Sequence, residues 1–442
     1  MFSNDFLWGT SSAAYQIEGS PLADGASPSI WHDFSHRKGR IKNNHHGDIA
    51  CDHYHRYQED IDHLQELGVK AYRFSVSWPR IVPQAGAINT RGIDFYRRIV
   101  DLLLEAGIEP FITLFHWETP LWLEKQGGFR KRRSVDYLAE YGSILFRALG
   151  DLVKNWITIN EPMVYSIMGY VKGEHAPGRK NDLKGMFSAA HYLLLSHSRL
   201  VKNFRSAVAH GRIGIAQAQI WTMPHNPERA KDRQAAETMD DLLNRLYIDP
   251  LILGKYPHTV TRNFGRFLPP GWENDLREMA EPFDFVGINY YTSHSYRYSP
   301  LTPFTHARQI PIAGVKSSAM WQIYPEGLFN LLMRLKNEYG NPDCLITENG
   351  YPLIELPGAD PLQDQERISY LYEHIAASGR AVKEGVNLKG YFIWSLLDNF
   401  EWQHGYDMRF GLIRVDFNTL KREWRRSAYW FRDLIKSGGP DR

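Results

Sequence analysis

Eight short apolar segments alternate with longer amphipathic segments along the whole of this 442-residue chain. The apolar segments are rich in Ile, Val, Phe, Tyr and Thr, and several are continuously apolar. That pattern is typical of parallel strands covered on both faces, and the amphipathic segments have the spacing of helices that provide the cover. The predicted strands are residues 7–13, 71–77, 110–115, 156–160, 213–218, 285–290, 345–347 and 390–395.

Most of these strands are followed by a predicted helix. Tyr54, Ile61 and Leu64 share one face of the helix predicted over residues 53–67. The next predicted helix ends before Gly107, because glycine is a typical C-terminal cap. Eight alternating strands and helices favour an α/β protein of the (β/α)8 TIM-barrel type over an open doubly wound sheet. No glycine-rich dinucleotide motif follows the first strand, which also disfavours the open sheet. The other predicted helices are residues 135–149, 187–210, 229–246, 326–339, 364–385 and 425–436.

The chain is longer than a plain barrel, which needs about 250 residues. The excess lies mostly after strands, in residues 17–50, 162–186, 292–325 and 396–424. Loops in these places lie on the C-terminal face, where barrel enzymes keep their active sites, so we expect a deep pocket there. No linker, repeat or low-complexity segment divides the sequence. Residues 1–442 are therefore predicted to form a single catalytic domain with long loops at its C-terminal face.

Charge and hydropathy exclude several classes of partner. The 52 Lys and Arg residues nearly balance the 50 Asp and Glu residues, for a net charge of +2, which favours neither nucleic acid nor an anionic membrane as a partner. No apolar stretch reaches the roughly 20 residues of a membrane span, and the first residues lack the pattern of a signal peptide. We therefore expect a cytoplasmic protein.

One histidine-rich region resembles a metal site at first sight. It comprises His45, His46 and the segment from Cys51 to His55. His53 and His55 lie two residues apart at a helix start and face different sides, and no zinc-ligand spacing is met. We therefore expect neither a metal nor another cofactor.

Polar and aromatic side chains stand at the ends of most predicted strands, and barrel geometry collects such ends around one axis. Each residue alone would more often be structural, but their coincidence at successive strands indicates a site. Glu161 and Glu348 each follow an apolar strand beside an amide side chain, and two carboxylates that flank a neutral, hydroxyl-rich substrate are what glycoside hydrolysis requires. The strand-end residues are Gln16, Arg73, His116, Asn160, Glu161, Asn289, Tyr291, Glu348, Trp394, Glu401 and Trp402.

Most of these residues fall within longer motifs, six of which carry a resemblance to a known family. With them the chain resembles the family 1 glycoside hydrolases, the β-glucosidase family, over nearly its whole length. The motifs are FLWGT at 6–10, QIEG at 16–19, YRFSVSWPR at 72–80, NEP at 160–162, ITENG at 346–350 and WSLLDNFEW at 394–402.

The resemblance implies a retaining, exo-acting β-glycosidase that hydrolyses terminal β-D-glycosyl residues through a covalent glycosyl-enzyme. Glu161 would be the acid/base and Glu348 the nucleophile, with Arg73 and Asn289 supporting the nucleophile. The expected substrates are small neutral β-glycosides or short β-linked oligosaccharides. β-Galactosidase or β-fucosidase activity is expected beside β-glucosidase activity.

The resemblance also assigns sugar-binding roles. Trp394 would form the floor of the pocket, and Trp321 would face the aglycone. Tyr291 would donate a hydrogen bond to the nucleophile and take part in the binding site. Because relatives that act on 6-phosphorylated sugars usually replace the residue at position 401, Glu401 implies unphosphorylated substrates. The remaining assignments are Asn160 to the 2-hydroxyl and Gln16, His116, Glu401 and Trp402 to the outer hydroxyls.

Two residues depart from the family pattern, and two alternatives stay open. Met163 stands where Trp is common at the aglycone site, which leaves the aglycone preference open, and Glu118 stands where Asp is usual. A transglycosylase would use the same intermediate, and the sequence does not separate it from a hydrolase. A non-catalytic glycan-binding protein of the same fold is disfavoured, because such proteins typically lose one of the two carboxylates.

Overall fold

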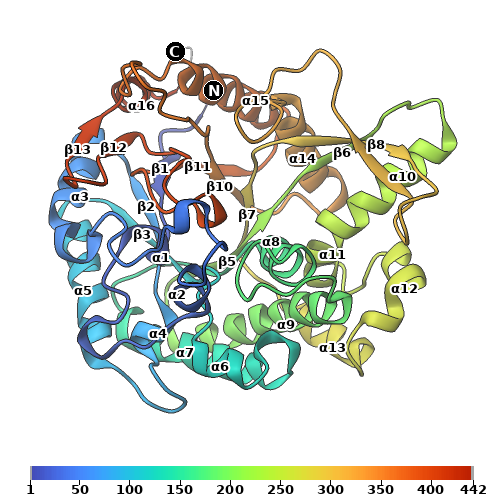
Figure 1. Cartoon of the computed structure of the whole chain (residues 1–442), viewed down its shortest axis with the longest axis horizontal. Helices are drawn as coiled ribbons and strands as arrows, with labels where there is room; N and C mark the ends of the chain where they lie inside the picture. The colour runs from blue at the N-terminus through green and yellow to red at the C-terminus, as the bar shows by residue number, and fades with distance from the viewer. Residues whose placement is uncertain (1, 440–442) are drawn as a thin grey trace.

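In a computed structural model of the chain, which describes residues 2–439, eight parallel strands close into a barrel (Figure 1). Their hydrogen-bonded order is β1-β11-β10-β7-β5-β4-β3-β2, and β1 closes the barrel by pairing with both β11 and β2. The predicted (β/α)8 fold is therefore confirmed, and every predicted strand is present. The strands are β1 (Leu7–Ser11), β2 (Ala71–Ser75), β3 (Glu109–Phe115), β4 (Asn155–Asn160), β5 (Arg212–Ala218), β7 (Phe285–Asn289), β10 (Cys344–Asn349) and β11 (Leu388–Trp394).

The interior of the barrel is filled by side chains from all eight strands. Gly9 lets two of these strands approach closely, since a Cβ atom there would lie 2.5 Å from the Phe392 ring and 2.7 Å from the Ala71 carbonyl oxygen. The barrel is therefore a packed core and not a channel, so a ligand site has to lie at its mouth. The interior cluster comprises Ala71, Phe111, Ile157, Ala216, Phe285, Leu345 and Phe392, with Leu7 packed against it.

Helices surround the barrel on its outer side (Figure 1). The predicted helices are confirmed except over residues 229–246, where the helix is interrupted by a π-helical turn, Asp241–Arg245. The helices of the ring are α3 (His53–Leu67), α5 (Thr90–Glu105), α7 (Arg133–Leu149), α9 (Leu183–Ala207), α11 (Leu246–Ile252), α13 (Trp272–Met279), α14 (Pro325–Glu338), α15 (Gln365–Lys383) and α16 (Arg426–Ser437). Helix α10 (Ala230–Asp240) packs instead on a small sheet outside the barrel.

Several long segments after the strands contain secondary structure that the sequence did not predict. Residues 292–325 include two strands, which join a third one in a small sheet of order β6-β8-β9 outside the barrel (Figure 1). A second pair of short strands lies in residues 396–424. The elements are β6 (Trp221–Pro224), β8 (Ser293–Tyr298), β9 (Ala307–Ile310), β12 (Ile413–Val415), β13 (Arg422–Trp424), α1 (Ala14–Ile17), α2 (Ile30–Ser35), α4 (Trp78–Ile81), α6 (Leu121–Lys125), α8 (Pro162–Ser166) and α12 (His258–Phe264).

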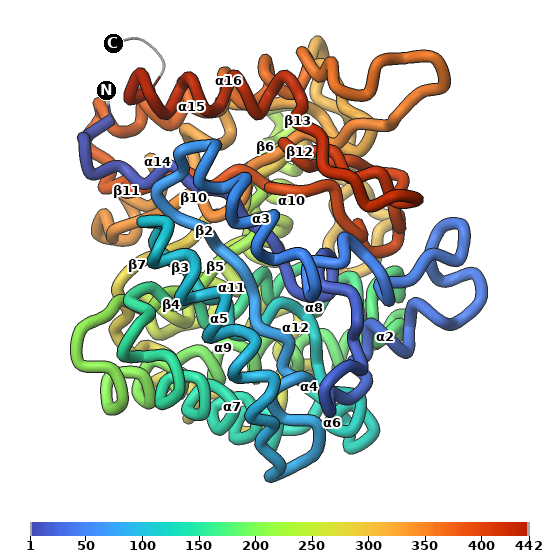
Figure 2. The backbone as a smooth tube through the Cα atoms, turned by 90° about the vertical axis from the view of Figure 1, so that its left-hand side faces the viewer, coloured from blue at the N-terminus to red at the C-terminus, as the bar shows by residue number. Residues whose placement is uncertain are grey.

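The last helix returns to the start of the chain. Helix α16 lies beside the N-terminal segment in both views (Figures 1 and 2), and the rings of Trp8 and Phe431 are 6.2 Å apart. This contact closes the helical ring over β1. Within residues 2–439, no helix combines the length and the hydrophobicity that crossing a bilayer requires.

Candidate active site

Glu348 lies near the end of β10 and is only 4% exposed. Arg73, from β2, donates a hydrogen bond of 2.5 Å from Nη1 to Oε1 of Glu348, and the Tyr291 hydroxyl donates one of 2.8 Å to Oε2. Both carboxylate oxygens thus have a strong donor, one of them a permanent cation. These contacts fix the orientation of the carboxylate at the mouth of the barrel.

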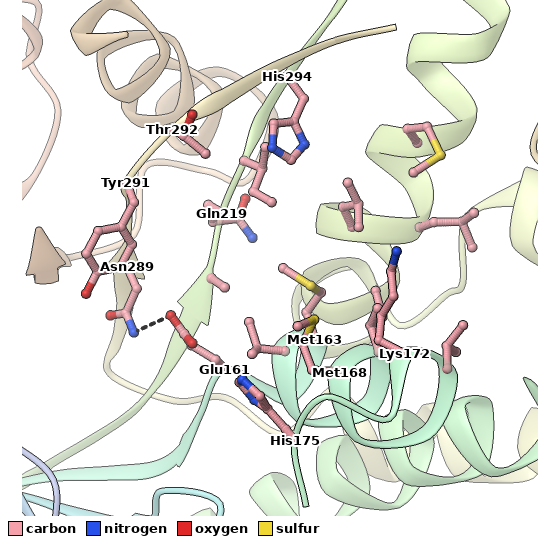
Figure 3. Close-up of a pocket in the computed structure, with 18 of the residues that line it drawn as sticks. Glu161, Met163, Met168, Lys172, His175, Gln219, Asn289, Tyr291, Thr292 and His294 are labelled. Atoms are coloured by element: carbon pink, nitrogen blue, oxygen red, sulfur yellow. Dashed lines mark hydrogen bonds between the residues drawn. The ribbon is translucent and has the colours of Figure 1, made fainter. Parts of the chain in front are cut away.

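Glu161 follows β4 directly and caps the start of α8. Its backbone has φ +46°, in the left-handed region that non-glycine residues rarely adopt, and Pro162 comes next. The Glu161 amide donates a 2.8 Å hydrogen bond to the Ala216 carbonyl of β5, which helps to hold this conformation. Its side chain receives one hydrogen bond, of 2.8 Å, from Nδ2 of Asn289 to Oε1 (Figure 3).

An amide network joins the two carboxylates. Asn160 Oδ1 accepts hydrogen bonds from Arg73 Nη2 at 2.6 Å and from Asn289 Nδ2 at 3.0 Å. Because its oxygen takes both donors, its Nδ2 points the other way and donates to His116 Nε2 at 3.0 Å. His116 Nδ1 has no hydrogen-bond partner among the described residues. The network therefore places an N–H group of Asn160 and the imidazole edge of His116 beside the two carboxylates.

Burial changes the protonation of these groups. It raises the pKa of Glu161 to about 8, and the charge of Glu348 adds to the rise. Burial also raises the pKa of Glu348, but Arg73 and Tyr291 oppose that rise. Burial and Arg73 together hold the pKa of His116 well below its ordinary value, so this ring is neutral. The two carboxyl groups thus have unlike environments, one tied to a cation and one to a neutral amide.

The structure brings the sequence-predicted residues together around a cavity of about 800 Å³. Gln16 and Arg73 lie behind its wall. Gln16 Nε2 donates to Asn399 Oδ1 at 2.9 Å and to Glu401 Oε2 at 3.3 Å. The predicted residues in the lining are His116, Asn160, Glu161, Asn289, Tyr291, Trp321, Glu348, Trp394, Glu401 and Trp402.

Aromatic rings enclose one side of the cavity. The Trp402 ring lies 4.3 Å from that of Trp31 and 4.7 Å from that of Trp117, and the His116 ring stacks between those of Trp394 and Trp402 at about 6 Å. Burial, and then the charge of Glu348, raises the pKa of the neighbouring Glu401 to about 8. Flat rings next to a largely protonated carboxyl group suit an uncharged ligand that has both apolar faces and hydroxyl groups.

The opposite side of the cavity is largely apolar. Met163 and Met168 project from α8 and from the π-helical segment Ile167–Lys172 that follows it (Figure 3). Trp321 packs on Tyr291 at 5.0 Å between ring centroids. Sequence reasoning missed several lining residues of the cavity. Met168 and Lys172 lie in the π-helical segment, which has no regular hydrophobic period, and His175 follows it and packs on Trp117 of the aromatic side. Gln219 and His294 were missed as well; of the five, only Gln219 lies directly beyond a barrel strand.

Comparisons with known proteins agree with this geometry. The sequence model of Glycosyl hydrolase family 1 matches residues 1–440. Beta-glucosidase A of Thermotoga maritima is 47% identical over 444 residues, which cover 99% of this chain and 98% of the relative. Beta-glucosidase A of Acetivibrio thermocellus is 45% identical over 447 residues, which cover 99% of each chain. The solved family 1 β-glucosidase of Thermotoga maritima superposes with a TM-score of 0.97 at 46% identity and covers 100% of this chain and 99% of its own. The chain therefore belongs to glycosyl hydrolase family 1 and is a glycosidase built on a (β/α)8 barrel.

Proposed function

We propose that the protein is a retaining, exo-acting β-glucosidase whose acid/base is Glu161 and whose nucleophile is Glu348. One observation carries the proposal: two buried carboxyl groups line one cavity, and of these two groups it is Glu348 that receives a hydrogen bond from Arg73. A nucleophile must be ionised, which a guanidinium favours. A general acid must hold its proton near neutral pH, which a pKa of about 8 allows.

In the first step, a Glu348 oxygen attacks the anomeric carbon of the bound sugar. The bond from that carbon to the glycosidic oxygen breaks, and Glu161 gives its proton to the departing oxygen. The product is a glycosyl ester of Glu348. Formation of this ester removes the negative charge of Glu348, so the pKa of Glu161 falls.

In the second step, the ionised Glu161 takes a proton from water. The water oxygen attacks the anomeric carbon, and the ester bond to Glu348 breaks. Two displacements restore the original β configuration. Asn160 is placed to donate its free amide hydrogen to the 2-hydroxyl, a contact that strengthens in the transition state.

The lining of the cavity favours neutral substrates, and we propose that these are small β-glycosides or short β-linked oligosaccharides. The relatives are named β-glucosidases, and solved structures of the Thermotoga maritima enzyme hold deoxynojirimycin and castanospermine. The aromatic wall around Trp402 supports exo action, because it covers one end of the cavity. We further propose that residues 1–442 act as one catalytic domain in the cytoplasm.

The test is hydrolysis of p-nitrophenyl β-D-glucoside, with the galactoside and fucoside alongside it. Wild-type protein should release nitrophenol from at least the glucoside between pH 5 and 8, and inertness towards all three would refute the proposal. Glu348→Gly should be inactive, and azide should restore turnover with an α-glycosyl azide as product. A β-glycosyl azide from this variant would show that the two glutamates are exchanged.

A further inference from the structure

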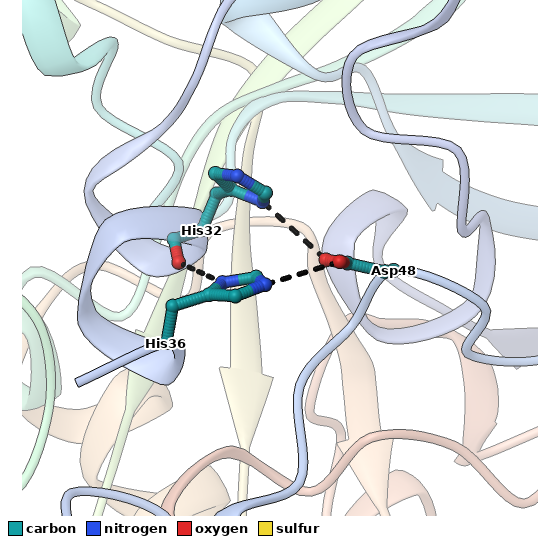
Figure 4. Close-up of side chains that lie close together, drawn as sticks. All are labelled: His32, His36 and Asp48. Atoms are coloured by element: carbon teal, nitrogen blue, oxygen red, sulfur yellow. Dashed lines mark hydrogen bonds and ion pairs between the residues drawn. The ribbon is translucent and has the colours of Figure 1, made fainter. Parts of the chain in front are cut away.

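His32 of helix α2, His36 at the C-cap of that helix and Asp48 of the following loop converge on one point, and none of them lines the active-site cavity (Figure 4). His32 and His36 are four residues apart, which places them on the same face of a helix. Nε2 of His36 lies 3.1 Å from Oδ2 of Asp48, and Nδ1 of His32 lies 3.4 Å from Oδ1. One ligand atom from each residue lies within 4.8 Å of the other two.

A backbone hydrogen bond fixes the orientation of the His36 ring. Its Nδ1 lies 2.7 Å from the carbonyl oxygen of His32. Because a carbonyl oxygen only accepts, Nδ1 carries the hydrogen and Nε2 is aimed at Asp48. This is the arrangement in which a metal-binding histidine normally donates its other N–H to a carbonyl or carboxylate.

His32 Nδ1 and Asp48 Oδ1 are a second sign of a ligand site. Both atoms are almost inaccessible to solvent, and neither has a hydrogen-bond partner among the described residues. They nevertheless face each other at 3.4 Å. Polar atoms placed in this way are normally satisfied by a hydrogen bond, a water or an ion.

His46, from the same loop, lies beside these three residues but outside the group whose ligand atoms are all within 4.8 Å of one another, so its side chain would have to rotate to become a fourth donor. Its ring stacks on that of His36, with centroids 4.7 Å apart, and its Nδ1 lies 3.4 Å from Asp48 Oδ2. The loop is held close to the barrel, because a Cβ atom on Gly47 would lie 2.8 Å from the ring of Tyr15. The Asp48 carbonyl also accepts a 2.8 Å hydrogen bond from the Ser20 amide. The loop that carries these donors is therefore positioned before any ion arrives.

We propose that His32, His36 and Asp48, with His46 as the fourth donor, form a site for a divalent transition-metal ion of the zinc class. Two ligand atoms of one tetrahedral zinc ion lie about 3.3 Å apart, since each bond is about 2.0–2.1 Å long. The nitrogen-to-oxygen distances are close to that separation: 3.4 Å from His32 to Asp48 Oδ1, and 3.1 and 3.4 Å from His36 and His46 to Asp48 Oδ2. The ligand atoms of His32, His36 and Asp48 lie within 4.8 Å of one another, so small side-chain rotations would bring them around one ion. Imidazole nitrogen with a single carboxylate suits zinc, whereas magnesium and calcium prefer sets of oxygen ligands.

The bound ion would join α2 to residues 45–50. Trp31, on the same helix, packs against Trp402 of the cavity wall. The ion thus stabilises one wall of the active site without touching the two candidate catalytic carboxylates. Its expected effect is on thermal stability and not on the chemical step.

Full-length protein freed of metal with EDTA and dialysed is titrated with zinc chloride in a calorimeter, and its thermal unfolding is followed with and without zinc. We expect one ion per chain and a midpoint raised by several degrees, because the ion binds only the folded state. Cobalt chloride serves as a spectroscopic probe, and its visible spectrum should be that of a tetrahedral nitrogen and oxygen site. The absence of stoichiometric zinc binding, or a spectrum like that of the hydrated cobalt ion, would overturn the proposal.

The double variant His32→Gln/His36→Gln should bind zinc at least about 100-fold more weakly and lose the midpoint shift. His55→Gln is the matched control, because His55 is also an exposed histidine beside an aspartate, with Nδ1 2.6 Å from Asp52 Oδ1. Its affinity should equal that of the wild type. Undiminished binding by a folded double variant, or an equal loss in the control, would overturn the proposal. If the double variant does not fold, Asp48→Asn takes its place with the same expected loss.

Discussion

The Tyr291 hydroxyl donates a 2.8 Å hydrogen bond to Oε2 of Glu348, and Arg73 occupies the other carboxylate oxygen. Burial raises the pKa of Glu348, and this hydrogen bond is one of the contacts that oppose the rise. In Tyr291→Phe the ionised form loses a donor, so the pKa rises further. The acid limb of the kcat/KM profile should move up by about one pH unit, as expected for one hydrogen bond to a charged group.

The neighbouring Tyr290 supplies the control. Its hydroxyl hydrogen-bonds to Ser293 and to the Tyr324 carbonyl, and not to Glu348. Tyr290→Phe should therefore leave the acid limb where it is, even if the protein becomes less stable. An unmoved acid limb in Tyr291→Phe would show that the hydrogen bond does not tune the nucleophile.

Glu161 should govern the alkaline limb of the same profile. Its pKa, raised to about 8 by burial and by Glu348, belongs to a group that must be protonated in the first step. Activity should therefore fall as the pH rises through about 8, and Glu161→Ala should lack this limb. The variant should keep activity on 2,4-dinitrophenyl glucoside, whose leaving group needs no proton, and azide should yield a β-glycosyl azide. An alkaline limb that persists in the variant would assign it to another group.

Glu401 should discriminate against phosphorylated sugars. It lines the cavity and is half-buried, and the Gln16 amide contacts its Oε2. Above its pKa of about 8 this carboxyl group is ionised, so a phosphate placed there would meet a like charge in a medium of low dielectric constant. Above pH 8 the kcat/KM for p-nitrophenyl β-glucoside should therefore exceed that for its 6-phosphate by at least about 100-fold, which a repulsion of roughly 3 kcal/mol would give. Glu401→Ser should lower the ratio of the two kcat/KM values. An unchanged ratio would mean that a residue other than Glu401 discriminates against the phosphate.

The apolar side of the cavity predicts a preference for hydrophobic leaving groups. Met163 and Met168 lie in this wall near Glu161, and Phe187 and Phe304 also line the cavity (Figure 3). Each buried methylene can contribute up to about 0.8 kcal/mol, so octyl β-glucoside should be hydrolysed with a kcat/KM about 10- to 100-fold above that of methyl β-glucoside. Met163→Trp should reduce this advantage by filling the space while leaving the methyl glucoside unaffected. Equal values for the two alkyl glucosides in the wild type would contradict the prediction.

The barrel and the strand-end residues were predictable from the sequence, because buried parallel strands leave continuous apolar runs and because their ends meet at one mouth. Glu161 and Glu348 stand out for that reason. The wall containing Met168 was not predictable, since a π-helical turn follows no regular period. The spatial neighbours of His46 were not predictable either. In the sequence it stands near the segment from Cys51 to His55, but the fold places it beside His36, at the C-terminal end of α2.

Asp398 and Arg425 should stabilise the segment that carries Glu401. The two side chains are fully buried and form two hydrogen bonds, of 2.7 and 2.9 Å, between the guanidinium and both carboxylate oxygens. Burial alone would raise the pKa of Asp398, but Arg425 and Arg409 outweigh it and hold the pKa below its ordinary value. Asp398→Asn removes the fully buried partner of Arg425 and leaves this buried cation with the partly buried Glu355 alone, 2.9 Å away, so the free energy of unfolding at pH 7 should fall by about 3 kcal/mol. Denaturant titration measures this loss.

The pH dependence of the free energy of unfolding shows whether Asp398→Asn acts through the lost ion pair or through altered packing. A carboxyl group with a lowered pKa in the folded state stabilises the protein above its unfolded pKa of about 3.9, and this contribution disappears as the pH falls through the folded value. The stability difference between wild type and Asp398→Asn should therefore shrink below about pH 4. Asp416→Asn is the control, because Asp416 is partly exposed and lies 3.7 Å from Arg414. Its effect on unfolding should stay below about 1 kcal/mol. An equal loss in both variants would mean that the buried pair contributes no more than a surface contact.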